Sequence, residues 1–312
     1  MKRAIHVIAF IVIALTVLAW LFPTRLIAPV FSWVETLRPS RHASMLFVGD
    51  MMFDRTIRQV AEREGGDSLF SCLGAYLDGF DAVVGNLEGP ITASPSLSLS
   101  TVPGQPGNTT FTFPTSTAGL LGRSGVDVVS LANNHSLDFG REGLEGTRAY
   151  LRSAGVGFFG DPLEPSKKSV VMDVNGLRVA LVGFNEFLGV DSVSGTEAEI
   201  RALRPVSDHV IVFAHWGDEY VPAIERQRTA GRAFIDAGAD AVIGAHPHVI
   251  QEVEEYRGKF IYYSLGNFIF DQYWEEGVRR GMVLELNLFR GMISFNPRYV
   301  NVERNKGPCL EV

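Results

Sequence analysis

VDVVSLANNHSLDFG, residues 126–140, joins a short apolar run to a polar segment that carries amide, imidazole and carboxylate groups. The run 126–131 is short and β-branched, which is typical of a buried strand. Residues 141–154 then follow a helical pattern and precede Gly155, in the position of a left-handed helix cap. A buried strand that leads through a polar loop into a helix predicts one unit of an α/β sheet.

Four further runs have the same character as 126–131 and are predicted to be buried strands: 45–49, 82–85, 210–214 and 241–244. A second helical stretch, 223–237, also precedes a glycine, Gly238. The alternation predicts a mostly parallel sheet with helices on its faces. Closer to the C-terminus, four consecutive segments are predicted as antiparallel additions: 249–256, 259–264, 278–288 and 292–302. Arg257-Gly258 and Arg290-Gly291 are predicted turns between them.

A carboxylate, an amide or an imidazole follows each of the five predicted parallel strands. These residues are Asp50; Asn86 and Glu88; Asn134, His135 and Asp138; His215 and Glu219; and His246 and His248. Ligand sites in open α/β sheets form outside the carboxyl ends of the strands, so we expect these side chains to converge. Nitrogen and oxygen donors without a thiolate suit Zn²⁺, Mn²⁺ or Fe.

His246-Pro247-His248 is the strongest local signal among the histidines. A single histidine in a loop is more typical of a hydrogen-bonded core residue than of a ligand. In an extended stretch, however, alternate residues point the same way, and the proline prevents a helix. Asp50 has a second interpretation that stays open, as the N-cap of a helix beginning near Asp54.

The donors also suggest a chemistry. Two metal ions about 3.5–4 Å apart, bridged by a carboxylate, activate water and neutralise an oxyanion at phosphorus or carbon. Glu88 is the best candidate for the bridge. His135, beside the candidate ligand Asn134, is predicted to act as a general acid.

Charge and cysteine content exclude several classes of protein. The 312 residues hold 28 Lys and Arg against 35 Asp and Glu, and the resulting net charge of −7 argues against nucleic-acid binding. The two cysteines, Cys72 and Cys309, are too few for a disulfide scaffold or a thiolate zinc cage. Whether they pair with each other stays open.

The N-terminus carries a candidate membrane anchor. Residues 4–22 are apolar except for His6 and Thr16, and Lys2 and Arg3 precede them. This length suits a transmembrane helix whose first residues, 1–3, lie in the cytoplasm. A cleaved signal peptide is the alternative, although no small-residue cleavage motif follows the run. Both interpretations place the rest of the chain outside the cytoplasm.

Residues 92–108, TASPSLSLSTVPGQPGN, form an uncharged segment rich in Ser, Pro, Gly and Thr. A flexible surface loop is one interpretation of it. The other is a rim over the active site, because long loops in compact domains often serve as lids.

Six blocks of the sequence resemble the CapA family of capsule and poly-γ-glutamate synthesis proteins. They are GD at 49–50, NLEGPIT at 86–92, LANNHSLDFG at 131–140, HWGDEY at 215–220, GAHPHV at 244–249 and YSLGNFIFD at 263–271. The resemblance covers about residues 44–290, and that family looks like a branch of the calcineurin-like metallophosphoesterases. It implies an α/β fold, a sandwich of two mixed sheets flanked by helices, here with one N-terminal transmembrane helix.

The resemblance also implies roles for individual residues. Asp50, Glu88 and His248 would hold one metal, and Glu88, Asn134, His215 and His246 the other, with His135 at the leaving group. Met52 departs from the pattern, because the calcineurin-like metallophosphoesterases usually have a histidine ligand two residues after the first aspartate. Two roles stay open for four further residues of the matched motifs, namely support of the ligands and contact with substrate. These residues are Asn86, Asp138, Glu219 and Asn267.

The expected layout is a cytoplasmic end (1–3), a transmembrane anchor (4–22), a linker (23–43), a metallophosphoesterase-like domain (44–303) and a tail (304–312). The leading hypothesis is a membrane-anchored, extracytoplasmic, metal-dependent hydrolase of capsule or poly-γ-glutamate synthesis or export. The alternatives are a general extracytoplasmic metallophosphoesterase and a non-catalytic polymer-binding subunit. The expected partners are an anionic polymer or a small phosphate-containing substrate, together with membrane synthase subunits. One or two divalent ions are the expected cofactor.

Overall fold

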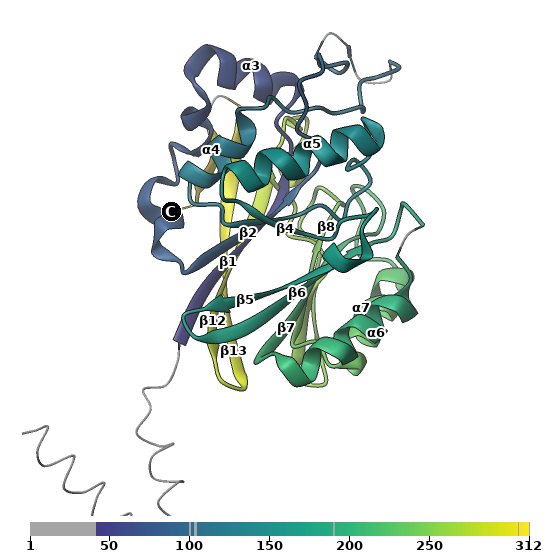
Figure 1. Cartoon of the computed structure of the whole chain (residues 1–312). Coiled ribbons are helices and arrows are strands. Elements are labelled where there is room, and N and C mark those ends of the chain that lie inside the picture. The colour runs from purple at the N-terminus through teal and green to yellow at the C-terminus, as the bar shows by residue number, and fades with distance from the viewer. Residues whose placement is uncertain (1–41, 100, 103–104, 190, 305, 312) are drawn as a thin grey trace, which may run out of the picture. The chain divides into compact units, whose positions relative to one another are not determined.

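Neighbouring residues of the first strand, β1 (His42–Met51), face two different hydrophobic cores. Met45 and Phe47 pack against residues of a second sheet, whereas Leu46 and Val48 pack against helices. Side chains alternate between the two faces of a sheet, so a strand that is apolar throughout has to be covered on both faces. The result is a sandwich of two sheets with helices outside, as Figure 1 shows.

The computed structural model describes residues 42–99, 101–102, 105–189, 191–304 and 306–311. One compact unit begins at His42. None of the helices in these ranges has the length and hydrophobicity needed to cross a bilayer. The predicted segments 1–3 and 4–22 lie outside the described residues, as does most of the predicted linker. The last two linker residues, His42 and Ala43, belong to β1.

The first sheet has eight strands, seven of them in the order β14-β13-β12-β1-β2-β3-β4, and β11 pairs with β1. Its other strands are β2 (Ala82–Leu87), β3 (Val128–Ser130), β4 (Gly157–Phe159), β11 (Asn267–Ile269), β12 (Arg280–Phe289), β13 (Met292–Glu303) and β14 (Gly307–Leu310). Strands β1 to β4 are parallel, and β12 to β14 extend the sheet in antiparallel fashion. This sheet is therefore mixed, as expected.

The second sheet has six strands in the order β5-β6-β7-β8-β10-β9. They are β5 (Ser169–Val174), β6 (Leu177–Asn185), β7 (His209–His215), β8 (Ala241–Ala245), β9 (Val253–Tyr256) and β10 (Lys259–Tyr262). The four inner strands are parallel, and β5 and β9 are antiparallel edges. It too is a mixed sheet.

Helices cover the outer face of each sheet (Figure 1). Those beside the first sheet are α3 (Arg55–Glu64), α4 (Thr117–Arg123) and α5 (Gly140–Ser153), and those beside the second are α6 (Val193–Leu203) and α7 (Glu225–Ala237). Shorter elements are α8 (Glu276–Arg279) and the 3₁₀ turns η1 (Gly66–Phe70), η2 (Gly74–Gly79), η3 (Pro165–Lys167) and η4 (Arg204–Val206). Gly238 ends α7 in the left-handed conformation that its position predicted.

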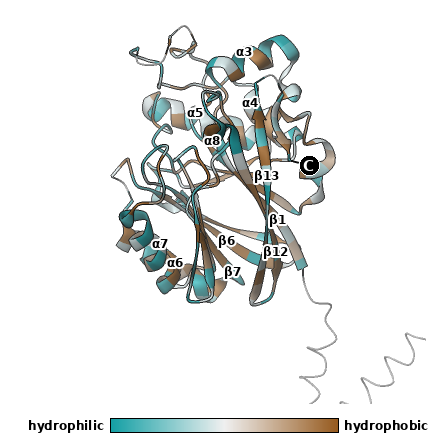
Figure 2. Cartoon of the chain, turned by 180° about the vertical axis from the view of Figure 1, so that it is seen from behind, coloured by the Kyte–Doolittle hydropathy of each residue, from teal (hydrophilic) through white to brown (hydrophobic). Residues whose placement is uncertain are grey.

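Three hydrophobic clusters hold the layers together. The middle cluster joins the two sheets, for example through Phe47 of β1 and Phe213 of β7, whose rings meet edge to face at 5.9 Å. The outer clusters join each sheet to its helices. Figure 2 shows the inner strands mostly in hydrophobic brown, while α6 and α7 carry more hydrophilic teal. Burial of apolar side chains on both faces of both sheets fixes the strand ends relative to one another.

A disulfide joins Cys72 to Cys309 and settles the question that the sequence left open. Cys309 lies in β14, which pairs with β13 at the edge of the first sheet. The expectation of a separate C-terminal tail over 304–312 is therefore corrected. Gly307–Leu310 are part of the sheet, and the crosslink ties them to the segment between η1 and η2.

All five predicted parallel strands are present, and β9, β10, β12 and β13 fall within or next to the predicted antiparallel segments. The β5–β6 hairpin was missed. Its turn contains Asn175-Gly176, both with positive φ, which is a common hairpin signal. Asp54, not Asp50, is the N-cap of α3, since its side chain accepts a hydrogen bond from Arg55 N. The capping interpretation of Asp50 is therefore wrong.

Candidate metal centre

The carboxyl ends of strands from both sheets carry the predicted ligands. In the first sheet, Asp50 of β1 lies opposite Asn86 of β2 on one side and Asn267 of β11 on the other. In the second sheet, His215 is the last residue of β7, and His246 directly follows β8. The sandwich brings together distant parts of the chain, because His246 N donates to Asp50 Oδ2 across a separation of 196 residues.

The first donor group consists of Asp50, Glu88 and His248. Each of them has one ligand atom that lies within 4.8 Å of a ligand atom of the other two. His248 Nδ1 lies 3.4 Å from Asp50 Oδ2, and His248 Nε2 lies 3.8 Å from Glu88 Oε1. All three side chains are buried. Two carboxylates and an imidazole at this spacing can hold a divalent cation.

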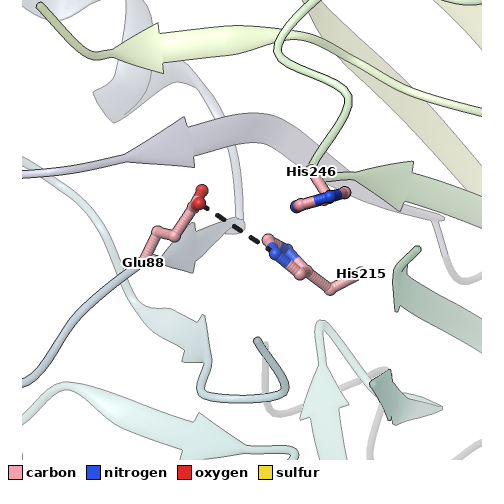
Figure 3. Close-up of side chains that lie close together, drawn as sticks. All are labelled: Glu88, His215 and His246. Atoms are coloured by element: carbon pink, nitrogen blue, oxygen red, sulfur yellow. Dashed lines mark ion pairs between the residues drawn. The ribbon is translucent and has the colours of Figure 1, made fainter. Parts of the chain in front are cut away.

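Glu88, His215 and His246 form the second donor group, with the same mutual spacing. Figure 3 shows the Glu88 carboxylate directed toward His215, whose Nε2 lies 4.0 Å from Glu88 Oε1. Asn134 joins this group, because its Oδ1 lies 2.7 Å from His215 Nε2. All six predicted ligands thus converge, and Glu88 belongs to both groups.

Two buried polar atoms of these groups have no hydrogen-bond partner within the described part of the chain: Glu88 Oε1 and His246 Nδ1. An unpaired buried polar atom costs about 1–3 kcal/mol, so such atoms call for a ligand. The unpaired oxygen is the one that faces both His248 and His215. The residues present therefore fit one or two divalent cations, with Glu88 shared between them.

The backbone of His246-Pro247-His248 differs from the expected extended stretch. His246 has φ 96° and His248 has φ 59°, both in the left-handed region that residues other than glycine rarely adopt. The two imidazoles nevertheless share one side, with ring centroids 5.9 Å apart. Strained residues of this kind cluster at functional sites, where the surrounding structure holds them in place.

Asn86 holds Asp50, a member of the first donor group, in position. Its Nδ2 donates to Asp50 Oδ1 at 2.7 Å, and its Oδ1 accepts from Asn133 Nδ2 at 3.0 Å. Asn133 also donates to Leu87 O. Both amides are buried, so this chain of hydrogen bonds fixes the rotamers of Asn86 and Asp50. Support of the ligands is therefore the role that the contacts give Asn86.

Burial and neighbouring charges set the protonation of the donors. Burial and the charge of Asp50 raise the pKa of Glu88 well above its usual value. Burial also opposes ionisation of Asp50, but the hydrogen bond and charge of His248 prevail and lower the Asp50 pKa. Burial and the neighbouring His246 lower the pKa of His215, and burial and His248 lower the pKa of His246 to about 3. Neutral imidazoles are the form that coordinates metal.

Asn267 and Met52 complete the surroundings of the first group. Asn267 Oδ1 lies 2.9 Å from His248 Nδ1, which leaves His248 Nε2 directed toward Glu88. Asn267 is held in turn by bonds to Gln272 Oε1 and Val278 O. Met52 is buried, and its sulfur accepts a hydrogen bond from Asp54 N. Met52 therefore adds no further side-chain ligand to the three of the first group, at the position where the usual pattern has a histidine.

His135, the predicted general acid, is oriented by Asp138. His135 Nδ1 lies 2.9 Å from Asp138 Oδ2, and the same oxygen accepts a bond from Phe111 N. The Phe111 ring packs on the imidazole, with centroids 4.3 Å apart. With Nδ1 engaged by Asp138, Nε2 is the nitrogen left for a substrate.

A pocket of about 220 Å³ adjoins these residues. His135, His248 and Glu219 line it, together with Tyr220 and Arg55. Glu219 is exposed, so it lies in the pocket wall and not in the buried donor groups. The long loop reaches the pocket through Asn108, which agrees with the interpretation of 92–108 as a rim.

The sequence assigned no role to three residues of this region, although Asn133 follows the strand 126–131 as Asn134 does. Asn133 orients Asn86, and Phe187 packs on His246 with ring centroids 4.3 Å apart. Phe187 follows β6, whose apolar run ending at Asn185 is a strand signal of the same kind as the five recognised. Arg55 lines the pocket from the first turn of α3, and no sequence pattern distinguishes it from the neighbouring basic residues of that helix.

Two mixed sheets between helices, with clustered acids, amides and imidazoles at the strand ends, are consistent with the metallophosphoesterase class. Solved structures share the fold. A phosphatase from Mycoplasma pneumoniae matches with a TM-score of 0.53 and 11% identity, over 87% of this chain and 96% of that one. A hypothetical protein from Thermus thermophilus matches with a TM-score of 0.53 and 20% identity, over 81% of this chain and 98% of that one. At these identities the likeness concerns the fold alone.

Residues 44–272 match the family of the bacterial capsule synthesis protein PGA_cap. The capsule biosynthesis protein CapA of Bacillus anthracis is 32% identical over 288 residues, 86% of this chain and 67% of that protein. The PGA biosynthesis protein CapA of Bacillus subtilis (strain 168) is 33% identical over 258 residues, 74% of this chain and 64% of that protein. This chain therefore belongs to the PGA_cap family, and it spans about two thirds of the length of these relatives.

Proposed function

We propose that this chain is a metal-dependent hydrolase that acts in the synthesis or export of a capsule polymer of the poly-γ-glutamate type. Its relatives are named for capsule and PGA biosynthesis, which supports the biological role. The observation that carries the chemical part is the pair of buried donor groups that share Glu88. They lie beside a pocket that His135 also lines.

In this proposal one divalent ion would be held by Asp50, Glu88 and His248. A second would be held by Glu88, Asn134, His215 and His246. When bound, the metal would supply an activated water and would neutralise the negative charge that develops on the oxygen of the attacked phosphoryl or carbonyl group. Asn86 and Asn267 keep Asp50 and His248 in their coordinating rotamers. His135 donates a proton from Nε2 to the leaving group, and Asp138 holds its Nδ1 during that transfer.

We further propose that the domain lies outside the cytoplasm, anchored in the cell membrane by a single helix over residues 4–22. The disulfide between Cys72 and Cys309 supports this location, because structural disulfides persist in oxidising compartments. The basic residues Lys2 and Arg3 support the orientation, since positive charge flanking a first helix favours the cytoplasmic side. Reactivity of a tag placed at each terminus, in intact cells, tests it.

Metal analysis of the purified full chain, combined with hydrolysis assays, tests the chemical part. We expect one or two equivalents of Mn, Zn or Fe, and hydrolysis of γ-linked glutamate polymer that Asp50→Asn and His248→Ala abolish. Cleavage of simple phosphodiesters but not of the polymer would instead identify a general phosphoesterase. Bound metal without hydrolysis of either would leave a polymer-binding subunit. A chain that binds no divalent metal would overturn the proposal.

Gene deletion in a polymer-producing host tests the biological part. We expect loss of surface polymer, restored by the wild-type gene but not by the gene encoding His135→Ala. Restoration by that variant would show that the role in the cell does not need the proposed acid. Unchanged polymer after deletion would remove the capsule role.

A further inference from the structure

A second pocket continues from the one beside the candidate metal centre. It measures about 270 Å³ and is lined by Thr56, Gln59 and Ser98 among others. Three residues line both pockets: Arg55, Asn108 and Trp274. The two hollows are therefore neighbours, and we consider them together as one elongated site, in which His135 and His248 line only the first hollow. A small ester needs only the first pocket, so the second calls for a further part of the substrate.

Arg55 is a cation fixed at the junction of the two pockets. Its guanidinium lies 5.0 Å from the Phe111 ring centroid and 5.5 Å from that of Phe270, and it pairs with Asp271. Asp271 also accepts a bond from Thr56 N, which holds it against the start of α3. Arg55 Nε is buried and has no partner within the described residues. The residue also has φ 47°, so the surrounding structure keeps it in an unfavourable backbone conformation.

The charges of the elongated site favour one anionic group at one place. Among the described residues that line the two pockets, Arg55 is the only arginine or lysine, and Glu219 and Asp271 are acids. Asp271 is already paired with Arg55, and Glu219 lines only the pocket nearer the metal centre. A chain that places one of its carboxylates close to Arg55 suits this site, because the planar guanidinium can donate hydrogen bonds to carboxylate oxygens.

The rest of the second pocket is lined by uncharged side chains, polar and apolar, and by the exposed Trp274. The polar ones include Thr56, Gln59 and Ser98, whose hydroxyl donates to Asp54 Oδ2, and the apolar ones are Leu99 and Val102. Trp274 is 61% exposed and meets Tyr220 edge to face at 5.6 Å. An exposed tryptophan beside hydroxyl and amide groups suits packing against an amide-linked chain. The indole ring covers apolar surface of the chain, while the neighbouring polar groups form hydrogen bonds with its amides.

We infer that the second pocket is a subsite for the continuing chain of an amide-linked acidic polymer. Arg55 binds the carboxylate of the unit next to the bond that is cleaved, and Trp274 packs against the unit beyond it. This inference rests on the proposed function and deepens it, because it assigns the substrate to extended chains and names the residues that select them. Asp271 is a positioning residue that holds the guanidinium of Arg55.

Equilibrium binding by the full chain tests the inference without requiring turnover. The His135→Ala variant serves as background so that ligands stay intact, and calorimetry compares the γ-linked glutamate dimer with a long γ-linked oligomer. We expect the long oligomer to bind about tenfold more tightly than the dimer, and Trp274→Ala to remove that gain while leaving dimer binding in place. Arg55→Gln should weaken both ligands by about ten- to a hundredfold. Arg55→Lys should restore part of the loss, since it keeps charge but not the planar fork.

Matched controls separate the subsite from general effects on folding. Met292→Ala removes another exposed apolar side chain, and Arg257→Gln removes a basic residue from the β9–β10 turn. Neither should change binding of either ligand. A γ-linked glutamine oligomer has the same amides but no carboxylates. It should bind the His135→Ala protein as weakly as the acidic oligomer binds the double variant His135→Ala/Arg55→Gln.

The outcomes distinguish this inference from the proposed function. Equal affinity for dimer and oligomer would overturn the subsite, even if the wild-type protein hydrolyses the polymer. An unchanged length dependence in Trp274→Ala, with that variant folded by circular dichroism, would overturn it as well. Length-dependent binding that Arg55 and Trp274 control, in a wild-type protein that hydrolyses nothing, would support the subsite while removing the hydrolase proposal.

Discussion

His135 Nδ1 lies 2.9 Å from Oδ2 of Asp138, three residues further along the chain. That carboxylate oxygen also accepts a bond from Phe111 N, so one side chain holds both the imidazole and the ring that packs on it. An imidazole held at Nδ1 presents Nε2 to the pocket in a fixed direction. The pair therefore fixes the direction in which His135 Nε2 faces the pocket.

We expect Asp138→Ala to slow hydrolysis by about ten- to a hundredfold with little change in metal content. The effect should depend on the leaving group, because a good leaving group departs without a proton. His135→Ala and Asp138→Ala should therefore slow a substrate with a poor leaving group far more than one with a good leaving group. Steady-state rates on such a substrate pair measure this. Equal loss on both substrates would show that Asp138 acts on folding or binding.

The shared position of Glu88 leads to a prediction about metal content. Because its carboxylate belongs to both donor groups, Glu88→Gln should remove all bound metal, whereas Asn267→Ala should weaken only the first group by about ten- to a hundredfold. Elemental analysis after dialysis against graded chelator measures both. Glu142→Gln, on the first turn of α5, is the control and should bind metal as the wild type does. Full occupancy in Glu88→Gln would rule out a bridging role.

Gly49 precedes the first aspartate and lies against the loop before β11. A Cβ at this position would come within 1.9 Å of Gly266 O, whereas a Cβ at Gly79 would meet no atom within 4 Å. We expect Gly49→Ala to cost about 3 kcal/mol and to lower metal affinity, because it pushes β1 away from the segment that carries Asn267. Gly79→Ala should leave both properties unchanged. Urea unfolding and metal titration of the two variants provide the test.

Much of the site followed from the sequence because its ligands sit at one repeated place, the end of an apolar strand. The run 241–245 and the motif His246-Pro247-His248 illustrate this: strand, proline and alternate imidazoles are all local features. The convergence of Asp50 with His248 followed from a general rule about strand ends, and did not require the order of strands to be known.

Other features depend on long-range packing that no local pattern reveals. The positive φ angles of His246 and His248 occur in the loop after β8, where His246 N donates to Asp50 of the other sheet. Asn133 orients Asn86 only because β2 and β3 are neighbours. The edge strand β14 carries few apolar residues, and its place is secured by pairing with β13 and by the crosslink at Cys309. Such contacts join residues that are far apart in sequence, so they become visible only in the folded chain.

The disulfide closes a loop of 237 residues and should contribute strongly to stability. Removal of a native disulfide typically costs about 2–5 kcal/mol. We expect the double variant Cys72→Ser/Cys309→Ser to unfold at lower urea concentration, and β14 to exchange its amide hydrogens sooner than β12. Addition of a reductant should destabilise the wild type but not the double variant. Equal urea midpoints for the two proteins would contradict the prediction.

His209 leads to a prediction about pH. It is buried at the start of β7, its Nε2 contacts Phe289 O at 2.7 Å, and its Nδ1 lies 3.8 Å from Asp240. Burial lowers the pKa of His209, and the attraction of Asp240 opposes that effect only in part. The unfolded chain, with a histidine pKa of about 6.5, therefore binds a proton more readily than the folded one. The contribution of His209 to stability is complete above the pKa of the unfolded chain. It is lost as the pH falls toward the lower pKa that His209 has in the folded protein.

We expect the free energy of unfolding to fall with pH below about 6.5, and His209→Gln to reduce that slope by at most about 1.4 kcal/mol per pH unit. Urea unfolding from about pH 7.5 to about pH 5 measures the slope. Val210→Ala is the matched control, since it weakens the neighbouring core without removing a titratable group, and it should lower stability at every pH equally. In the unfolded chain all histidines have a pKa of about 6.5, so the difference between the wild type and His209→Gln is the informative quantity. If the two slopes agree, burial of His209 does not make the fold sensitive to acid.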